Sequence, residues 1–344
     1  MLTPIPVVVG LNAVIVAVTR EVPRVLTVLR PELVPAAEGF AGSRIPDALP
    51  FGLLDPAGDR TLERGLRRWV REQSGLELGY VEQLYTFGDR QRDPLEGRDG
   101  SRVVGVAYLA LVREEQPSSS AHWVDCYLFF PWEDWRNGRP AAIDAAIAPA
   151  LNRWVSAAPA REMRRARRER TDIAFGLGGV PWDGERVLER YELIYEVGLV
   201  PEALYDRSWS RQGRPGVQNR GIPPGAKRAG DVHLGYPMAL DHRRMLATAL
   251  GRLRGKLKYH PLVFELLPST FTLFQLQRVV EALAGIRLHK QNLRRLVEKA
   301  GLVERTGSRT TATGGRPAEL FRFRREVLRE RPAPGVGIPG QRYA

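Results

Sequence analysis

The sequence predicts a mixed α/β domain followed by a small helical domain that ends in a basic hairpin. Strand-like apolar runs flank a single amphipathic helix in residues 10–112, and apolar residues recur at helical spacing in residues 241–299. Positive charge is also one-sided. Residues 242–344 carry 21 Lys and Arg against 7 Asp and Glu, whereas residues 1–241 carry 31 against 32. This segregation indicates a polyanionic partner at one end of the molecule, the alternative being that an Arg-rich composition merely solvates a helical domain.

Length and composition set the frame for this interpretation. A chain of 344 residues with 43% hydrophobic residues suits two domains with ordinary cores. The lone Cys126 excludes internal disulfides and suits the reducing cytoplasm. The apolar opening, residues 4–18, lacks a basic leader and a small-residue cleavage site, and Arg20, Glu21 and Arg24 interrupt it. We expect a buried strand there, a cytoplasmic protein and no membrane segment.

The N-terminal elements follow in the order strand, strand, helix, strand, strand. The first strand is nearly all apolar, as a central strand buried on both faces would be. The helix shows Leu62, Leu66, Trp69 and Val70 on one face, and Gly75 is placed to end it. The expected ranges are 10–18, 24–29, 61–73, 81–87 and 103–112. This order predicts an α/β sandwich.

The middle of the chain, residues 114–231, has a different composition. A strand is expected at 122–130, helices at 142–155 and 186–197, and a mobile loop rich in Pro, Gly and Arg at 208–230. Residues 161–172 contain six arginines against three acids. That run is either an accessory phosphate clamp, a solvated helix or an interdomain contact.

The C-terminal part predicts three helices and two strands. A long helix at 241–257 connects to a helix from 273 to 284, which Thr272 caps and Gly285 closes, with Phe274, Leu276, Val279, Val280 and Leu283 on its inner face. A second helix at 290–299 ends at Gly301, and two short strands enclose a glycine-rich basic loop at 308–318. Helix, turn, helix and basic hairpin together predict a winged helix-turn-helix.

The second helix of this motif is basic enough to enter a major groove. We expect Gln291, Asn292 and Arg295 to read base edges, unless the two amides only cap and solvate the helix start. Phosphate contacts are expected from Lys290, Arg294, Arg309 and Arg316, and from the hydroxyl-rich wing that includes Thr310.

Two short segments of the N-terminal part resemble a Nudix domain. Residues 48–52 (ALPFG) resemble the Leu-Pro-Gly-Gly that precedes a Nudix box, and residues 68–76 (RWVREQSGL) resemble its end. Members of this family use glutamates of that helix to bind magnesium or manganese. Here Trp69 and Gln73 replace two of them and only Glu72 remains, so we expect a vestigial site without metal, in which hydrolysis is lost or only a weak residual ADP-ribose pyrophosphatase activity is left. Glu72 is equally explained as a surface carboxylate paired with Arg68.

Longer segments resemble the NrtR family of bacterial repressors of NAD metabolism. They are QLYTFGD (83–89), RDP (92–94), RVVGVAYLA (102–110), ALDH (239–242), RLRGKLKY (252–259), FELLP (264–268), FTL (271–273), LQ (276–277) and GRPA (315–318). The resemblance covers roughly residues 10–113 and 232–325. The enlarged middle resembles related alphaproteobacterial NAD regulators sometimes named NadQ.

This resemblance implies a Nudix-like α/β/α sandwich (1–113) with an insertion (114–231), a linker helix (232–260), a C-terminal winged helix-turn-helix (261–330) and a flexible tail (331–344). It implies a homodimeric repressor of NAD-biosynthesis genes that binds a palindromic double-stranded operator and needs no cofactor. The effector would be an NAD-derived nucleotide such as ADP-ribose or NAD. In the mechanism we expect, nucleotide binding moves the long helix as a lever and spoils the spacing of two recognition helices, about 34 Å in the DNA-bound dimer.

A diphosphate nucleotide needs guanidinium groups for its phosphates and aromatic faces for its base. Arg30, Arg92 and Arg102 are candidates for the first role, and Tyr85, Phe87 and Tyr108 for the second, with Asp89 and Asp93 beside them. The aromatic residues are equally explained as core, and Asp93 as part of a turn that ends at Pro94. Two other functions remain open: an active Nudix hydrolase of ADP-ribose or a related nucleotide, and a winged helix that binds protein.

Overall fold

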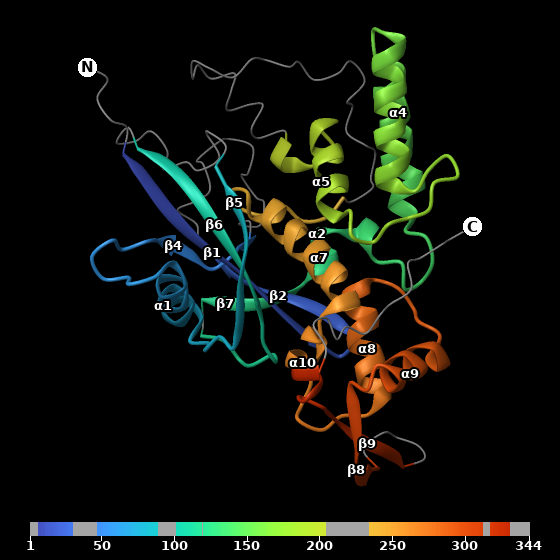
Figure 1. Ribbon diagram of the computed structural model, residues 1–344. Coiled ribbons are helices and arrows are strands. Elements are labelled where there is room, and N and C mark those ends of the chain that lie inside the picture. Colours follow the sequence, from blue (N-terminus) through green and yellow to red (C-terminus); the bar gives the residue numbers. More distant parts are fainter. Residues whose placement is uncertain are drawn as a thin grey trace.

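The protein is built on one mixed β-sheet that helices cover on both faces, with a second small sheet at the C-terminal end (Figure 1). The structure is a computed structural model and describes residues 6–29, 47–88, 101–118, 120–203, 234–311 and 317–330. The predicted α/β class with a C-terminal winged helix is confirmed. Among the described residues, no helix is both long and apolar enough to cross a lipid bilayer.

Strand β1 (Val7–Thr19) is the centre of the sheet. It runs parallel to β6 (Arg102–Leu111) and antiparallel to β2 (Val22–Leu29). Its alternate residues enter two different cores. Leu11 and Ile15 belong to the core under helix α1, whereas Val14 and Val16 belong to the core on the other face. The prediction of a central strand buried on both faces is therefore confirmed.

The remaining strands extend this sheet in the order β3-β2-β1-β6-β5, and β4 and β7 pair with β1 and β2 respectively. Their bounds are β3 (Asp47–Ala48), β4 (Phe51–Leu53), β5 (Tyr80–Phe87) and β7 (Ala121–Asp125). The β1–β2 turn places Arg20 and Glu21 at positive φ, 50° and 65°. Two left-handed residues are what a two-residue hairpin turn requires, although side chains larger than Gly adopt this conformation at a cost.

Helix α1 (Leu62–Ser74) covers one face of the sheet, and its ends follow the sequence signals. The Thr61 hydroxyl accepts a hydrogen bond from the Arg64 amide at 3.2 Å, and Gly75 closes the helix at a φ of 72°. Leu66 and Val70 are fully buried against the sheet. The helix predicted at 61–73 is therefore confirmed.

Residues 121–203 add one strand to the sheet and a group of helices to the face opposite α1. The strand expected at 122–130 is wrong in its second half, because Asp125 caps a helical turn and its carboxylate accepts from the Tyr127 amide at 2.8 Å. The helical elements are α2 (Cys126–Phe129), the 3-10 turn η2 (Pro131–Glu133), the π-helical turn η3 (Ile143–Ile147), α3 (Ala148–Ser156), α4 (Arg161–Phe175) and α5 (Val187–Glu196). The loop expected at 208–230 lies outside the described residues.

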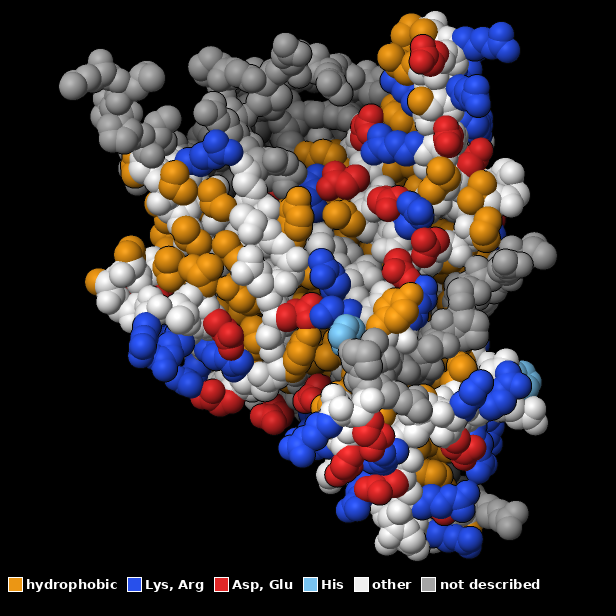
Figure 2. Space-filling view, in the orientation of Figure 1, with side chains coloured by type: hydrophobic (Ala, Val, Ile, Leu, Met, Phe, Trp, Pro, Cys, Tyr) orange, Lys and Arg blue, Asp and Glu red, His pale blue; other side chains and the backbone are white. Residues whose placement is uncertain are grey.

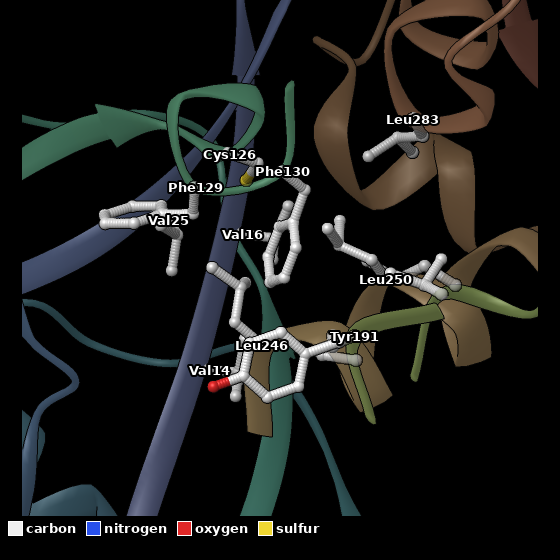
Figure 3. Close-up of a cluster of buried hydrophobic side chains, with 14 of the residues drawn as sticks. Val14, Val16, Val25, Cys126, Phe129, Phe130, Tyr191, Leu246, Leu250 and Leu283 are labelled. Atoms are coloured by element: carbon white, nitrogen blue, oxygen red, sulfur yellow. The ribbon is translucent and has the colours of Figure 1, made fainter. Parts of the chain in front are cut away.

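Helix α7 (His242–Tyr259) packs across this second face and forms the middle of the larger core. Figure 3 shows Leu246 and Leu250 between Val16 of β1, Tyr191 of α5 and Leu283 of the winged domain. Eleven of the eighteen residues of α7 are buried. The lever motion expected for this helix stays a prediction. Because the helices that follow β7 enclose α7, such a motion would move those helices with it.

A buried carboxylate holds three segments of this core together. Glu133 of η2 accepts two hydrogen bonds from Arg190 of α5, at 2.5 and 2.9 Å, and one from Arg254 of α7, at 2.5 Å. The Glu133 and Arg190 side chains are 0% exposed and that of Arg254 is 4% exposed. Burial alone would raise the pKa of Glu133, but the two guanidinium groups outweigh it and hold that pKa below its ordinary value. The carboxylate therefore stays charged inside the core.

Other arginines of α7 are also buried and paired. Arg243 meets Glu202 at 3.1 Å, and Arg244 pairs with both Asp241 and Glu192. Part of the C-terminal excess of positive charge is therefore neutralised inside the protein. The charge count overstated the free cationic surface, because a sequence does not show which arginines meet acids from elsewhere in the chain.

We predict that Glu133→Gln destabilises the protein by about 3–5 kcal/mol, because two buried guanidinium groups lose their counter-charge. Glu196→Gln is the matched control. Glu196 pairs with Arg170 but both side chains are over 40% exposed, so the loss should stay below about 1 kcal/mol. Urea unfolding at neutral pH measures both, and equal losses would contradict a special role for Glu133.

The same carboxylate predicts a pH dependence. Because its folded-state pKa is lowered, its contribution is complete above the unfolded-state pKa of about 4.3 and is lost as pH falls through the lower folded-state value. Unfolding of Glu133→Gln should therefore depend less steeply on pH below about 4.3 than unfolding of the unmodified chain.

Candidate functional site

The C-terminal domain has the elements of a winged helix-turn-helix. They are the 3-10 turn η4 (Leu262–Leu266), α8 (Leu273–Ala284), α9 (Lys290–Lys299), β8 (Val303–Thr310), β9 (Ala318–Phe323) and α10 (Val327–Glu330). Strands β8 and β9 pair antiparallel and form the wing. In Figure 1 this domain lies at the lower right, with the wing at its tip.

Helix α8 is the helix against which α9 packs. Thr272 and Gln275 form a reciprocal capping box at its start, and Gly285 ends it at a φ of 71°. Leu276 and Val280 are fully buried. The prediction that Phe274 faces inward is wrong: it is 51% exposed and lies under the Arg278 guanidinium at 4.7 Å.

Glu281 fixes the turn between α8 and α9. Its carboxylate accepts from the Leu288 amide at 3.0 Å and the Gln277 amide group at 2.7 Å, and it pairs with Arg278 and Arg287. Burial opposes the charged form, but these donors together lower the pKa of Glu281. Sequence reasoning missed this residue. The available signal was a Gln and a Glu four residues apart within an otherwise apolar stripe.

Helix α9 presents its polar face to solvent. Leu293 and Val297 are buried against the domain, whereas all five predicted DNA contacts on this helix are exposed: Lys290, Gln291, Asn292, Arg294 and Arg295. Arg294 pairs with Glu298 at 3.0 Å along the helix. The helix starts at His289 without a side-chain cap, so Gln291 and Asn292 are not used as its N-cap.

The wing differs from its prediction in one respect. Strand β8 continues to Thr310, past a bulge between Arg305 and Arg309 where Gly307 has a φ of 78°. Arg309 and Thr310 therefore lie on the strand, opposite Glu319 and Ala318, and not in the loop. The extra residues of a bulge disguise a strand in a sequence pattern. Arg309 is exposed, whereas Arg316 lies outside the described residues.

The winged domain packs against the rest of the chain through the end of α8. The last carbonyls of α8 receive donors from other segments: the Tyr127 hydroxyl at 2.6 Å to Ala282, Arg254 at 3.2 Å to Leu283, and the Trp135 amide at 2.7 Å to Gly285. Helix ends leave such carbonyls without intrahelical partners. Two of these donors come from residues 114–231, and the third, Arg254, also binds Glu133. The position of α8 is thus coupled to the buried carboxylate.

The face of α1 that corresponds to a Nudix metal site carries a different arrangement. The Trp69 indole donates to the Leu53 carbonyl at 2.8 Å, and the Gln73 amide bonds both the amide and the carbonyl of Phe51, at 3.1 and 2.6 Å. Glu72 is exposed and lies 3.5 Å from Arg68. In the part of the chain that the structure describes, no three His, Cys, Asp or Glu side chains gather in a metal-binding group.

The predicted nucleotide contacts fall into three groups. Arg30, Asp89, Arg92 and Asp93 lie outside the described residues. Phe87 and Tyr108 are buried in the cores on opposite faces of the sheet, so they do not form one stacking site. Burial raises the pKa of the Tyr108 phenol, with a smaller effect from the charge of Glu63.

Tyr85 and Arg102 remain as accessible candidates. Tyr85 is 59% exposed and stands against the Phe87 ring at 5.2 Å. Arg102 is half-buried and donates to the Gly88 carbonyl at 2.6 Å. Gly88 and Arg102 flank residues 89–100, which contain three of the other candidates. This end of β5 and β6 therefore borders the segment that contains Asp89, Arg92 and Asp93, and their nucleotide contacts stay a prediction.

The C-terminal domain is similar to a known DNA-binding family. Residues 263–323 match the family described as the NrtR DNA-binding winged helix domain. A segment of 86 residues, 25% of this chain, is 41% identical to the ADPR-responsive transcriptional repressor NtrR of Acinetobacter baylyi. That segment spans 34% of the relative's length.

Solved structures show the same fold over nearly the whole chain. The crystal structure of Shewanella oneidensis NrtR complexed with a 27mer DNA matches with a TM-score of 0.51 at 20% identity, covering 93% of this chain and 95% of that one. A MutT/nudix family protein from Enterococcus faecalis matches with a TM-score of 0.50 at 15% identity, covering 94% and 88%. At these identities the likeness establishes the fold, a Nudix-like sandwich with a winged helix.

The packing of Trp69 against β4 predicts a strong dependence on Gly52. A Cβ at Gly52 would lie 2.0 Å from the Trp69 ring, so Gly52→Ala should destabilise the chain by about 1–3 kcal/mol. Gly79→Ala is the control, because a Cβ at Gly79 meets nothing within 4 Å.

A double-mutant cycle separates this clash from a backbone effect. In a Trp69→Ala background the cost of Gly52→Ala should fall to that of the control, which denaturant unfolding measures. An unchanged cost would show that Trp69 is not what makes Gly52 necessary.

Proposed function

We propose, on the premise that residues 263–323 form an NrtR-type winged helix domain, that the protein is a transcriptional repressor of NAD-biosynthesis genes. The observation that carries this proposal is the exposed polar face of α9, on a helix whose buried face is fixed to α8 by Leu293 and Val297. A helix held in this way and lined with amide and guanidinium groups fits a major groove.

Each exposed residue then has a role in DNA binding. Gln291, Asn292 and Arg295 would contact base edges, where bidentate amide and guanidinium contacts discriminate between bases. Phosphates would be bound by Lys290, Arg294, Arg309, Thr310 and Arg316. Since one winged domain reads one half-site, a homodimer on a palindromic operator would place two copies of α9 in successive major grooves.

The sensor is proposed to bind an NAD-derived nucleotide, with ADP-ribose favoured over NAD because the Acinetobacter relative is named as ADPR-responsive. The surface between β5 and β6, near Tyr85 and Arg102, offers an aromatic face and a guanidinium group for such a ligand. We further propose that hydrolysis is lost. Trp69 and Gln73 cannot supply the carboxylates that a hard cation requires. Their hydrogen bonds already engage the backbone of β4, and Gly52 of that strand lies under the Trp69 indole.

Coupling between sensor and reader would run through the docked end of α8. A nucleotide that binds the DNA-incompetent arrangement better by a few kcal/mol releases the operator, whereas equal affinity for both arrangements changes nothing. The contacts of Tyr127, Trp135 and Arg254 with α8 are among the described contacts that connect the two parts.

The decisive experiment is a titration of labelled DNA from upstream of NAD-synthesis genes, with and without ADP-ribose, NAD or nicotinamide mononucleotide. We expect tight binding to the free protein and release by ADP-ribose. Hydrolysis of ADP-ribose with magnesium is measured in parallel. Efficient magnesium-dependent cleavage by a chain indifferent to DNA would overturn the proposal in favour of a hydrolase.

Substitutions on α9 and on the wing should have different signatures. Arg295→Ala should cost about 1–3 kcal/mol on the operator and relax preference at one base pair, because a base contact is lost. Arg309→Ala should weaken binding to all duplexes and make the plot of log affinity against log salt shallower by about 0.9. Arg67→Ala, on α1, is the control and should change neither. Identical effects of the first two variants would contradict the separate roles.

A further inference from the structure

Helix α4 carries a concentration of arginine that the winged helix does not account for. It projects from the upper right of the molecule, at the opposite end from the wing (Figure 1). Residues 161–170 contain six arginines and two glutamates, and all but Arg167 are classed as exposed. In Figure 2, Lys and Arg side chains (blue) lie along the projecting helix, with Asp and Glu side chains (red) between them. Among the described residues, the exposed arginines of this helix form no contact with the winged domain.

Four of these arginines occupy one face of the helix. They stand at positions i, i+3, i+4 and i+7, which neighbour one another on a helix surface. We call this set the α4 stripe: Arg161, Arg164, Arg165 and Arg168. Within the described chain, none of the four pairs with a carboxylate. Arg164 donates to the Ala158 carbonyl at 3.3 Å and Arg168 to the Asn152 side chain at 2.6 Å.

The other two arginines of the helix are engaged elsewhere. Arg167 lies over the Trp154 ring at 4.4 Å and donates to the Trp154 carbonyl at 2.7 Å. Arg170 pairs with Glu196 of α5. These two contacts attach the helix to its neighbours and leave the α4 stripe on the solvent side.

This arrangement is unfavourable in the isolated protein. Like charges three and four residues apart repel, and Arg161 and Arg164 near the helix start oppose the helix dipole, which Glu162 in the first turn offsets only in part. Ala160, at the N-cap position, supplies no side-chain cap to offset this. A polyanion bound along the stripe would remove both penalties.

The geometry points to the phosphate backbone of duplex DNA as that polyanion. At 1.5 Å per residue the stripe is about 10 Å long, a length over which a duplex presents about six charges. Met163, 44% exposed, is the large apolar side chain on this part of the helix, which is too little for an amphipathic membrane helix or for the apolar anchors of a protein interface.

We propose that the α4 stripe is a second DNA-binding surface, independent of sequence and separate from the winged helix. Because it lies at the other end of the molecule from the wing, it contacts duplex outside the half-site that α9 reads. It belongs to the region 114–231, so it gives that region a binding role in addition to its docking of α8. The stripe fixes no base and adds affinity and salt dependence only.

The test uses the full chain and a labelled duplex of scrambled sequence. In the stripe variant, R161Q/R164Q/R165Q/R168Q, affinity at low salt should fall about ten-fold or more, and the salt slope should become shallower by about 3–4. The matched control is R20Q/R60Q/R64Q/R113Q, which removes the same charge from exposed arginines elsewhere. Its affinity at low salt and its salt slope should both stay within about two-fold of the values for the unmodified chain. Equal losses in the two variants would overturn the proposal, because net charge alone would then explain them.

Two further arms keep the result unambiguous. The stripe changed to lysine, R161K/R164K/R165K/R168K, should retain the salt slope, which separates a lost charge from a misfolded helix. The reader variant K290E/R295E should lose preference for operator over scrambled duplex yet keep stripe-dependent binding. If the reader variant abolishes all duplex binding, the stripe is not a DNA surface, whatever the operator result shows about the proposed repressor.

A lipid surface is the competing polyanion. The unmodified chain and the stripe variant should bind vesicles containing phosphatidylserine to the same extent. Stripe-dependent vesicle binding with unchanged affinity for scrambled duplex would overturn the proposal.

Discussion

The structure depends on one carboxylate that is charged and fully enclosed. Glu133 reaches α5 through Arg190 and α7 through Arg254, and Arg254 continues to the end of α8. A buried ion of this kind is tolerated only when its partners satisfy it almost completely. It therefore fixes the geometry of every element that supplies a partner. The orientation of the winged domain is therefore set by the core of the sheet domain.

On α1, Trp69 and Gln73 also use their polar groups to bond the backbone. Positions that hold metal in a Nudix box carry an indole and an amide, and both bond the backbone around β4. The Trp69 ring packs directly on Gly52, where a Cβ would lie 2.0 Å from it. The two cores of the sandwich lie on either side of the sheet and do not include Trp69 or Gln73, so the fold does not depend on which side chains occupy these two positions.

The region between the two recognised parts has two physical effects. Its inner residues, such as Tyr127 and Trp135, satisfy the C-terminal carbonyls of α8, while its outer helix α4 places uncompensated cations in solvent. Glu281 extends the order into the winged domain by fixing the turn before α9. Buried polar contacts thus occur at both η2 and the turn before α9, and buried polar contacts of this kind have few alternative arrangements.

The sequence by itself determined what depends on local patterns. The apolar run of β1, the Thr61 and Gly75 ends of α1, and the limits of α9 follow from periodicity and capping, which act over a few residues. Only the tertiary structure decided which charges are free. Arg254 and Glu133 are 121 residues apart, Phe274 turns outward and Phe87 and Tyr108 separate to opposite cores, because burial and pairing are set by elements distant in the chain.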